Sequence, residues 1–103
     1  MTRIHWSGPA IRELEGALDF IARDNREAAD RLGRKLHAVV GRLKAFPDSG
    51  RIVPELEDPG LREVLHAPFR VLYEHRENVV QILAVVRSEQ EPDFEAIQKR
   101  MIP

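Results

Sequence analysis

The sequence predicts an α+β fold of two layers, in which a helical hairpin packs on one face of a small antiparallel β-sheet. Two patterns support this prediction. From about residue 10 to residue 46, apolar side chains recur at the three- and four-residue spacing of amphipathic helices. From residue 51 onward they alternate or form short continuous runs, as strands do. A short strand before the helices and a short helix after the last strand complete the expected order.

Length and composition limit the class of protein. The 103 residues, 43% hydrophobic and 32% charged, predict a single soluble domain over residues 1–103. There is no cysteine, which excludes disulfides, thiolate catalysis and cysteine-ligated zinc. The N-terminus resembles no signal peptide, and the longest apolar run, Ile82–Val86, cannot span a bilayer. We therefore expect a cytoplasmic protein without a membrane partner.

The helical half of the chain begins after a short alternating strand, Arg3–Trp6. Ser7 and Pro9 then provide a helix N-cap and a first-turn proline. A first helix is expected over Ala10–Ala22, and a second after the cap candidate Asn25. The core face of the second helix is predicted to contain Ala28, Leu32, Leu36, Val39, Leu43 and Phe46. The connection is so short that the two helices must form an antiparallel hairpin.

The strand half begins after the turn residues Pro47–Gly50. Pro54 limits the first segment, Arg51–Leu56, to the edge of a sheet. Strands are expected at Leu61–Ala67, at Phe69–His75, and at Val79–Val86, whose apolar run indicates an interior strand covered on both faces. A C-terminal helix after Pro92 would place Phe94, Ile97 and Met101 on one side. We expect the sheet face opposite the hairpin to be open to a ligand or partner.

Four arginines recur on or beside the predicted strands: Arg51, Arg62, Arg70 and Arg87. If the two middle strands form a hairpin about Pro68, Arg62 and Arg70 could project from one face and bind a phosphate or an acidic protein segment. In the alternative interpretation, each arginine pairs with a nearby glutamate and only solvates the sheet. The glutamates available for this are Glu55, Glu57, Glu63 and Glu74.

Groups for other chemistry are sparse. Proton transfer near the arginines could involve Glu55, Glu63, His66 or Tyr73, but no spacing fixes their geometry. The histidines are scattered, so no metal site is predicted. There is no glycine-rich phosphate loop or serine nucleophile elbow, and no cofactor is expected. Sixteen basic and seventeen acidic residues leave a net charge of −1, which excludes bulk attraction to nucleic acid.

The order of several short motifs resembles the RelE/ParE superfamily of type II toxin–antitoxin toxins over nearly the whole chain. These motifs are Trp6 followed by a helix with Leu14 and Ile21, Ala28-Ala29, Phe46-Pro47 with Gly50-Arg51, Pro54-Glu55-Leu56, Leu61-Arg62-Glu63, Phe69-Arg70-Val71-Leu72-Tyr73, and Ile82-Leu83 with Arg87. The resemblance implies a helical hairpin against a small antiparallel sheet. It also implies a growth-inhibiting toxin in a hetero-oligomer with a cognate antitoxin.

Two mechanisms divide the superfamily that this chain resembles. ParE-like members poison DNA gyrase without catalysis, whereas RelE-like members cleave mRNA in the ribosome. By resemblance, a nuclease would use Glu55, Arg62, Arg70, Tyr73 and Arg87. After Arg87 this chain has Ser88-Glu89-Gln90-Glu91, where similar nucleases place a His or Tyr, and carboxylates there would repel RNA.

We therefore predict a non-enzymatic, ParE-like inhibitor whose target is gyrase. The alternatives are a ribosome-dependent mRNA endoribonuclease and a degenerate, non-toxic member. The residues predicted to bind a partner are Arg51, Arg62, Arg70, Arg87 and Phe94. The acidic segment from Glu89 to Glu95 is expected to contribute to the same binding.

Overall fold

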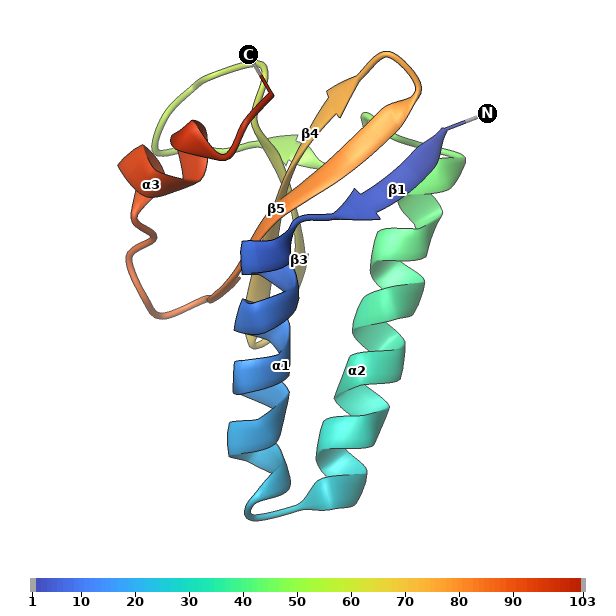
Figure 1. Ribbon diagram of the computed structural model, residues 1–103, viewed down its shortest axis with the longest axis vertical. Coiled ribbons are helices and arrows are strands. Elements are labelled where there is room, and N and C mark those ends of the chain that lie inside the picture. The colour runs from blue at the N-terminus through green and yellow to red at the C-terminus, as the bar shows by residue number, and fades with distance from the viewer. Residues whose placement is uncertain (1, 103) are drawn as a thin grey trace.

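The computed structural model describes residues 2–102, and its elements follow the predicted order (Figure 1). A strand, a helical hairpin, a strand meander and a short helix succeed one another along the chain. Their bounds are β1 Arg3–Trp6, α1 Gly8–Ala22, α2 Arg26–Gly41, the 3₁₀ turn η1 Arg42–Lys44, β2 Arg51–Ile52, β3 Arg62–His66, β4 Phe69–Arg76, β5 Val79–Arg87 and α3 Phe94–Lys99.

The strands form one mixed sheet in the order β1-β5-β4-β3-β2. Antiparallel pairing is confirmed for β2 to β5, whereas β1 pairs in parallel with β5. The α1–α2 hairpin connects β1 to β2, which lie at the two opposite edges of the sheet. Because β5 lies between β1 and β4, its predicted interior position is confirmed, and most of its central side chains are buried.

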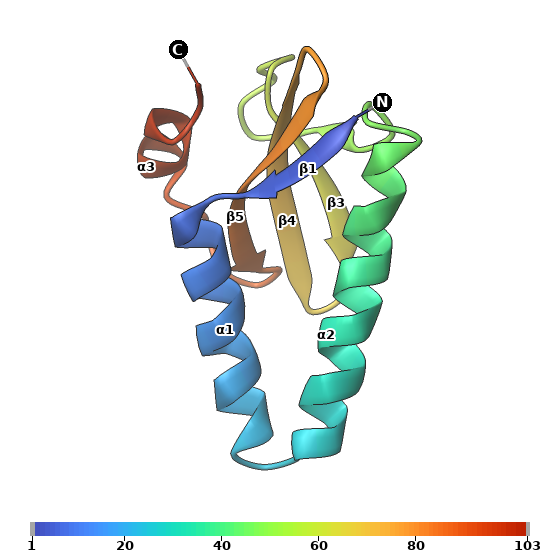
Figure 2. The same ribbon diagram turned by 45° about the vertical axis from the view of Figure 1, so that its right-hand side comes forward.

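Both long helices have the N-caps that the sequence predicts, and α1 begins at Gly8, two residues before its predicted start. The side chain of Ser7 accepts a hydrogen bond from the N–H of Ala10 at 3.2 Å, and Asn25 accepts one from Ala28 at 3.0 Å. Figure 2 shows the two helices side by side along the sheet and extending past its lower end. Their apolar faces close the main core, whose buried members are Ala10, Leu14, Leu36, Val40, Leu43, Phe69, Val71, Tyr73, Val80, Ile82 and Val85.

The end of the second helix differs from the prediction. The α-helix stops at Gly41 and tightens into η1, so the regular spacing that would bring Phe46 onto the core face is lost. Phe46 is therefore 66% exposed rather than buried. Leu43, which lies within η1, still reaches the core.

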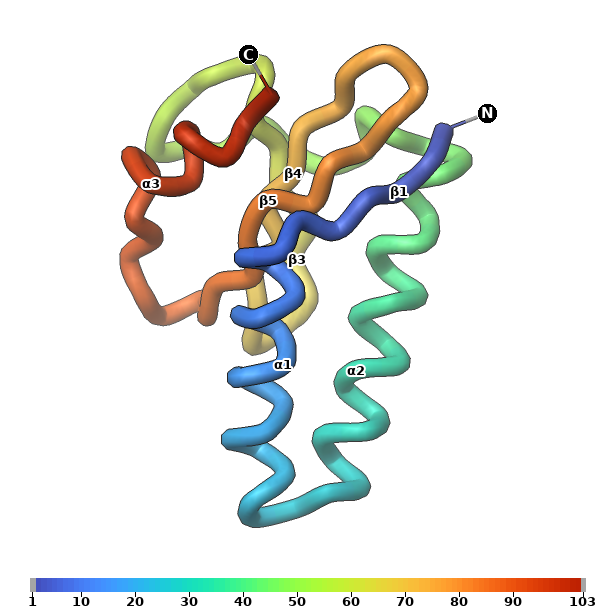
Figure 3. Tube along the Cα trace, in the orientation of Figure 1, coloured from blue at the N-terminus to red at the C-terminus, as the bar shows by residue number. Residues whose placement is uncertain are grey.

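The expectation of an open second sheet face is wrong. A second core covers that face, built from Val53, Leu61, Leu72, Leu83, Ala84 and Ile97, with Leu56, Val86, Phe94 and Met101 packed against it. The segment between β2 and β3 and the helix α3 provide this cover. After β5 the chain turns back along the molecule to α3, so the C-terminal end lies beside the segment between β2 and β3 (Figure 3).

Candidate functional site

The strand register separates the two arginines that the sequence places together. In the β3–β4 ladder, Arg62 lies opposite Tyr73 and Arg70 lies opposite Leu65. Directly opposed residues share a face, so Arg62 and Arg70 project from opposite faces of the sheet. The prediction that they share one face is wrong, because the two-residue turn at Ala67-Pro68 fixes the register.

On the second face, Arg70 is held by two carboxylates. Its Nε donates to Glu63 Oε1 at 2.6 Å, and its two terminal nitrogens donate to Glu55 at 2.8 and 2.9 Å. The ring of Phe94 lies 6.0 Å from the guanidinium carbon. The hydrogen bonds from Arg70 lower the pKa of Glu55, and those carboxylates raise the pKa of Arg70. The guanidinium is therefore neutralised within the chain.

A second arginine completes this group of charges. Arg51 on β2 donates through Nε to Glu63 Oε2 at 2.7 Å, so the Glu63 carboxylate bridges two guanidinium groups. The Glu63 side chain is fully buried, whereas that of Arg51 is 54% exposed. We call Arg51, Glu55, Glu63 and Arg70 the arginine–carboxylate cluster. It ties β2, the segment after β2, β3 and β4 together.

On the helical face, Tyr73 and Arg62 hold the turn that precedes β2. The Tyr73 hydroxyl donates to the carbonyl of Pro47 at 2.8 Å and accepts from the N–H of Gly50 at 2.9 Å. Arg62 donates to the carbonyl of Gly50 at 2.8 Å. Burial raises the pKa of Tyr73, and its side chain is inaccessible to a substrate. Both residues act here as structural supports of the turn.

Arg87 lies apart from the cluster at the end of β5. It is opposite Phe69, which places it on the helical face, and its guanidinium pairs with Glu89. The five residues considered for a nuclease therefore do not converge on one site. Glu55 and Arg70 lie on the second face, whereas Arg62, Tyr73 and Arg87 belong to the helical face. Arg51 and Arg70 instead pair with nearby glutamates, as the alternative interpretation of the strand arginines expects.

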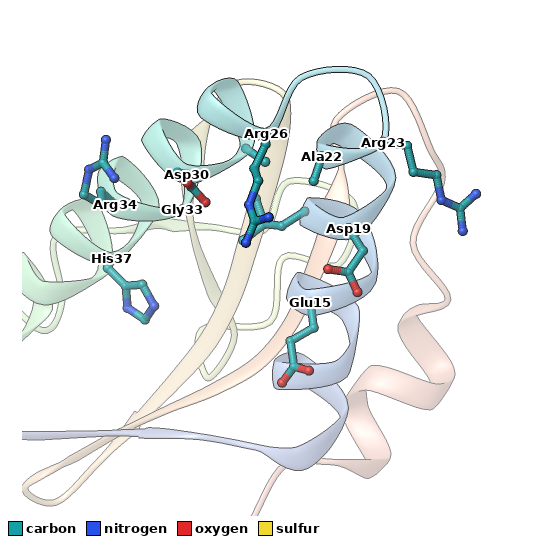
Figure 4. Close-up of a pocket in the computed structure, with 11 residues that line it drawn as sticks. Glu15, Asp19, Ala22, Arg23, Arg26, Asp30, Gly33, Arg34 and His37 are labelled. Carbon is teal, nitrogen blue, oxygen red and sulfur yellow. The ribbon is translucent and has the colours of Figure 1, made fainter.

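A further hollow lies in the helical hairpin, away from the residues predicted to bind a partner. Between α1 and α2 lies a groove of about 940 Å³, whose walls carry charged side chains (Figure 4). The residues that line it are Glu15, Leu18, Asp19, Ala22, Arg23, Arg26, Ala29, Asp30, Gly33, Arg34 and His37. Small residues at facing positions of the two helices, such as Ala22, Ala29 and Gly33, are the sequence signal that could have indicated it.

Two kinds of site find no support within residues 2–102. This part of the chain holds no group of three or more His, Asp or Glu side chains placed to bind a metal ion. Its helices are too short and too polar to cross a bilayer.

The comparison with protein families is decisive. The model described as "ParE toxin of type II toxin-antitoxin system, parDE" matches residues 4–92. The chain belongs to the ParE toxin family. The matched region runs from β1 to the end of the sheet and stops before α3 of this ParE toxin.

A solved structure supports the same assignment. A chain described as "Chromosomal ParDE TA system from P. aeruginosa" is similar to this ParE toxin, with a TM-score of 0.72 and 25% sequence identity. The alignment covers 86% of this chain and 98% of the other. A search of curated proteins found no match. The helical hairpin and sheet described above are thus shared with a solved member of a ParDE system.

Proposed function

We propose that this ParE toxin inhibits bacterial growth by binding DNA gyrase and that a cognate antitoxin neutralises it. The family match over residues 4–92 carries this proposal, because ParE-like members of the superfamily act on gyrase. The ParDE title of the similar solved structure supports an antitoxin as the partner and a hetero-oligomer as the neutralised form. Inhibition of gyrase would take place in the cytoplasm and would need no cofactor.

The arginine–carboxylate cluster supports binding rather than RNA cleavage. A ribonuclease needs a guanidinium that is available to the scissile phosphate and acid–base groups beside it. Arg70 instead donates to two carboxylates, one of them buried. A phosphodiester approaching Arg70 would have to displace Glu55 and would face its negative charge.

The predicted partner-binding residues stay a proposal. Arg51 and Arg87 have accessible side chains, so each could contact a partner while keeping its internal carboxylate. Arg62, Arg70 and Phe94 are more enclosed, and their contribution would be to shape the surface around them.

The experiment compares the two targets directly. The purified full chain is added to gyrase with relaxed plasmid, and separately to translating ribosomes with a defined mRNA. We expect supercoiling to be inhibited or cleaved DNA to be trapped, while the mRNA stays intact. Cuts at codon positions that disappear in Arg87→Ala or Arg70→Ala would overturn the proposal.

Induction in bacteria tests the same proposal in the cell and identifies a non-toxic member. When the chain is induced alone, we expect DNA damage signalling to precede any arrest of translation. Arrest of translation first would indicate the ribosome as the target. Unchanged growth, with the folded chain present in the cells, would indicate a member without toxicity.

A further inference from the structure

The strand β5 is longer than its neighbour β1. Their pairing ends where Trp6 lies opposite Ile82, and the N–H of Ser7 then donates to the Ile82 carbonyl at 3.0 Å as the chain turns into α1. β5 continues to Arg87 between α1 and β4 (Figure 2). Within residues 2–102, the last part of β5 therefore pairs with a strand on one side only. An edge of this kind can pair with another chain unless it is protected.

An extra residue in β5 decides which backbone groups face this edge. Tyr73 lies opposite Ile82, but Leu72 lies opposite Ala84, so Leu83 has no opposite residue in β4. Such a bulge shifts the alternation of the strand beyond it. The Leu83 carbonyl and the N–H of Val85 consequently both turn toward the open edge, where their hydrogen-bond partners are side chains.

Two side chains from distant parts of the sequence provide these partners. Glu13 on α1 accepts a hydrogen bond from the N–H of Val85 at 3.1 Å. Arg100, which follows α3, donates through Nη1 to the Leu83 carbonyl at 3.0 Å and to the two Glu13 oxygens at 3.2 and 3.3 Å. The Ser7 hydroxyl also reaches the Leu83 carbonyl, at 3.4 Å. We call Glu13 and Arg100 the edge-capping pair.

The edge-capping pair also limits access to the edge. A hollow of about 350 Å³ lies beside it, lined by α1, the last residues of β5 and the segment from Gln90 to Arg100. The Glu13 and Arg100 side chains are 35% and 25% exposed, so they stand between solvent and the strand, whereas Val85 is only 6% exposed. Truncating both side chains would enlarge the hollow and open the edge at Val85.

An opened edge would be complementary to the same edge of a second copy. Val85 and Val86 are β-branched residues, which favour strands. If two copies meet about a two-fold axis at Val85, the Val85 N–H of each copy donates to the Val85 carbonyl of the other. In this register Arg87 of one copy lies opposite Leu83 of the other, so like charges do not face each other directly.

We propose that Glu13 and Arg100 prevent the protein from associating with a second copy of itself through β5. They occupy the position of the missing strand, satisfy the backbone groups that this strand would bind, and place two charges at the edge. Arg100 lies beyond residues 4–92, which the family model matches, so the protection of this edge depends on the C-terminal segment. Neither gyrase nor an antitoxin is needed for this role.

The experiment compares two double variants of the full chain. Glu13→Ala/Arg100→Ala removes the edge-capping pair. Glu95→Ala/Lys99→Ala is the matched control, because it also removes one acidic and one basic side chain, from an exposed ion pair of α3. Sedimentation velocity over a range of concentrations measures association, and amide hydrogen exchange by NMR measures the protection of Val85. Circular dichroism and thermal melting establish folding. If the first variant is unfolded, Glu13→Ala alone removes the acceptor of Val85.

We expect the Val85 amide of dilute Glu13→Ala/Arg100→Ala to exchange roughly tenfold faster than that of the control, since it has lost its hydrogen bond. As the concentration is raised, this variant should form dimers, and its Val85 amide should become protected again. The unmodified chain and the control should stay monomeric under the same conditions.

Four results would overturn the inference. Unchanged exchange of Val85 in the dilute variant would show that Glu13 does not protect the edge. Fast exchange in a variant that stays monomeric at every concentration would show that the pair does not prevent association. Dimers that leave the Val85 amide unprotected would place their contact on another surface. Equal association of the unmodified chain would show that the edge-capping pair blocks nothing.

Discussion

Arg70 and Glu63 form an ion pair inside the protein, with 2.6 Å between the arginine Nε and the carboxylate Oε1. The Arg70 side chain is only 9% exposed and that of Glu63 is fully buried. Glu63 also accepts from Arg51, and Arg70 also donates to Glu55. The pair therefore belongs to a network in which removing one member leaves the others with uncompensated charge.

The first prediction concerns Glu63. In Glu63→Ala, the Arg70 guanidinium loses its buried partner, so we expect the free energy of unfolding to fall by about 3–5 kcal/mol. Urea denaturation measures this loss. Glu89→Ala is the control, because it removes the exposed partner of Arg87 and should leave the stability nearly unchanged. Equal losses in the two variants would contradict the role of the buried pair.

The second prediction concerns the pH dependence of stability. Hydrogen bonds from Arg70 lower the pKa of Glu55 in the folded chain. A group with a lowered pKa stabilises the fold above its unfolded pKa, and this contribution disappears as the pH falls through the folded pKa. The Glu55→Gln variant lacks this contribution at every pH. As the pH is lowered from about 5 to about 3, the unmodified chain should therefore lose more unfolding free energy than the variant.

Urea titrations at several pH values measure this difference. Because Glu55 is partly exposed, solvent screening makes its contribution small. If the unmodified chain and Glu55→Gln lost stability in parallel over the whole pH range, the contact between Glu55 and Arg70 would not stabilise the fold.

The third prediction concerns the turn before β2. A Cβ at Gly50 would lie 2.6 Å from the Tyr73 hydroxyl oxygen and 2.7 Å from the Glu63 carbonyl oxygen. Gly50→Ala should therefore displace the turn and destabilise the chain by about 2 kcal/mol or more. Tyr73→Phe removes the hydroxyl that satisfies Gly50 and should cost about 1–3 kcal/mol. Thermal denaturation measures both losses.

Combining the two substitutions distinguishes the two close contacts that an alanine at position 50 would make, with the Tyr73 hydroxyl and with the Glu63 carbonyl oxygen. In the double variant, removing the Tyr73 hydroxyl leaves the close approach to the Glu63 carbonyl unchanged. We therefore expect Tyr73→Phe to rescue Gly50→Ala only in part. Full rescue would assign the whole effect to the hydroxyl and would exclude the backbone contact.

The fourth prediction concerns the cover of the second sheet face. Ile97 is 3% exposed and packs in the second core, so Ile97→Ala should reduce stability by about 2–5 kcal/mol. Phe20→Ala removes a larger side chain, but this residue is 62% exposed on α1 and should cost less than about 1 kcal/mol. A larger loss for Phe20→Ala would show that α3 contributes little to the packing.

Several elements could be predicted because their signals are local. The caps at Ser7 and Asn25 and the three- and four-residue spacing placed both long helices. The apolar run at Val79–Val86 indicated a buried interior strand. The error at Phe46 also has a local origin, since a change from α to 3₁₀ geometry over three residues leaves no clear mark in the sequence.

The candidate site was less predictable because it depends on contacts between distant residues. Spacing alone suggested that Arg62 and Arg70 could share a face, but the turn at Ala67-Pro68 sets a register that separates them. The partners of Arg70 are Glu63, seven residues away, and Glu55, fifteen residues away. Which glutamates pair with Arg70 depends on how the segment between β2 and β3 folds over the sheet.

By itself, the sequence determined the helices, the strands, their order and the resemblance to the RelE/ParE superfamily. Repeats of three to four or of two residues fix the face that each element buries, and this preference acts within a few turns of the chain. Only the tertiary structure decided which arginines are neutralised, that both sheet faces are covered, and that a groove lies between the two helices of the hairpin. Those properties depend on strand register and on the packing of segments far apart in the chain, which local patterns do not specify.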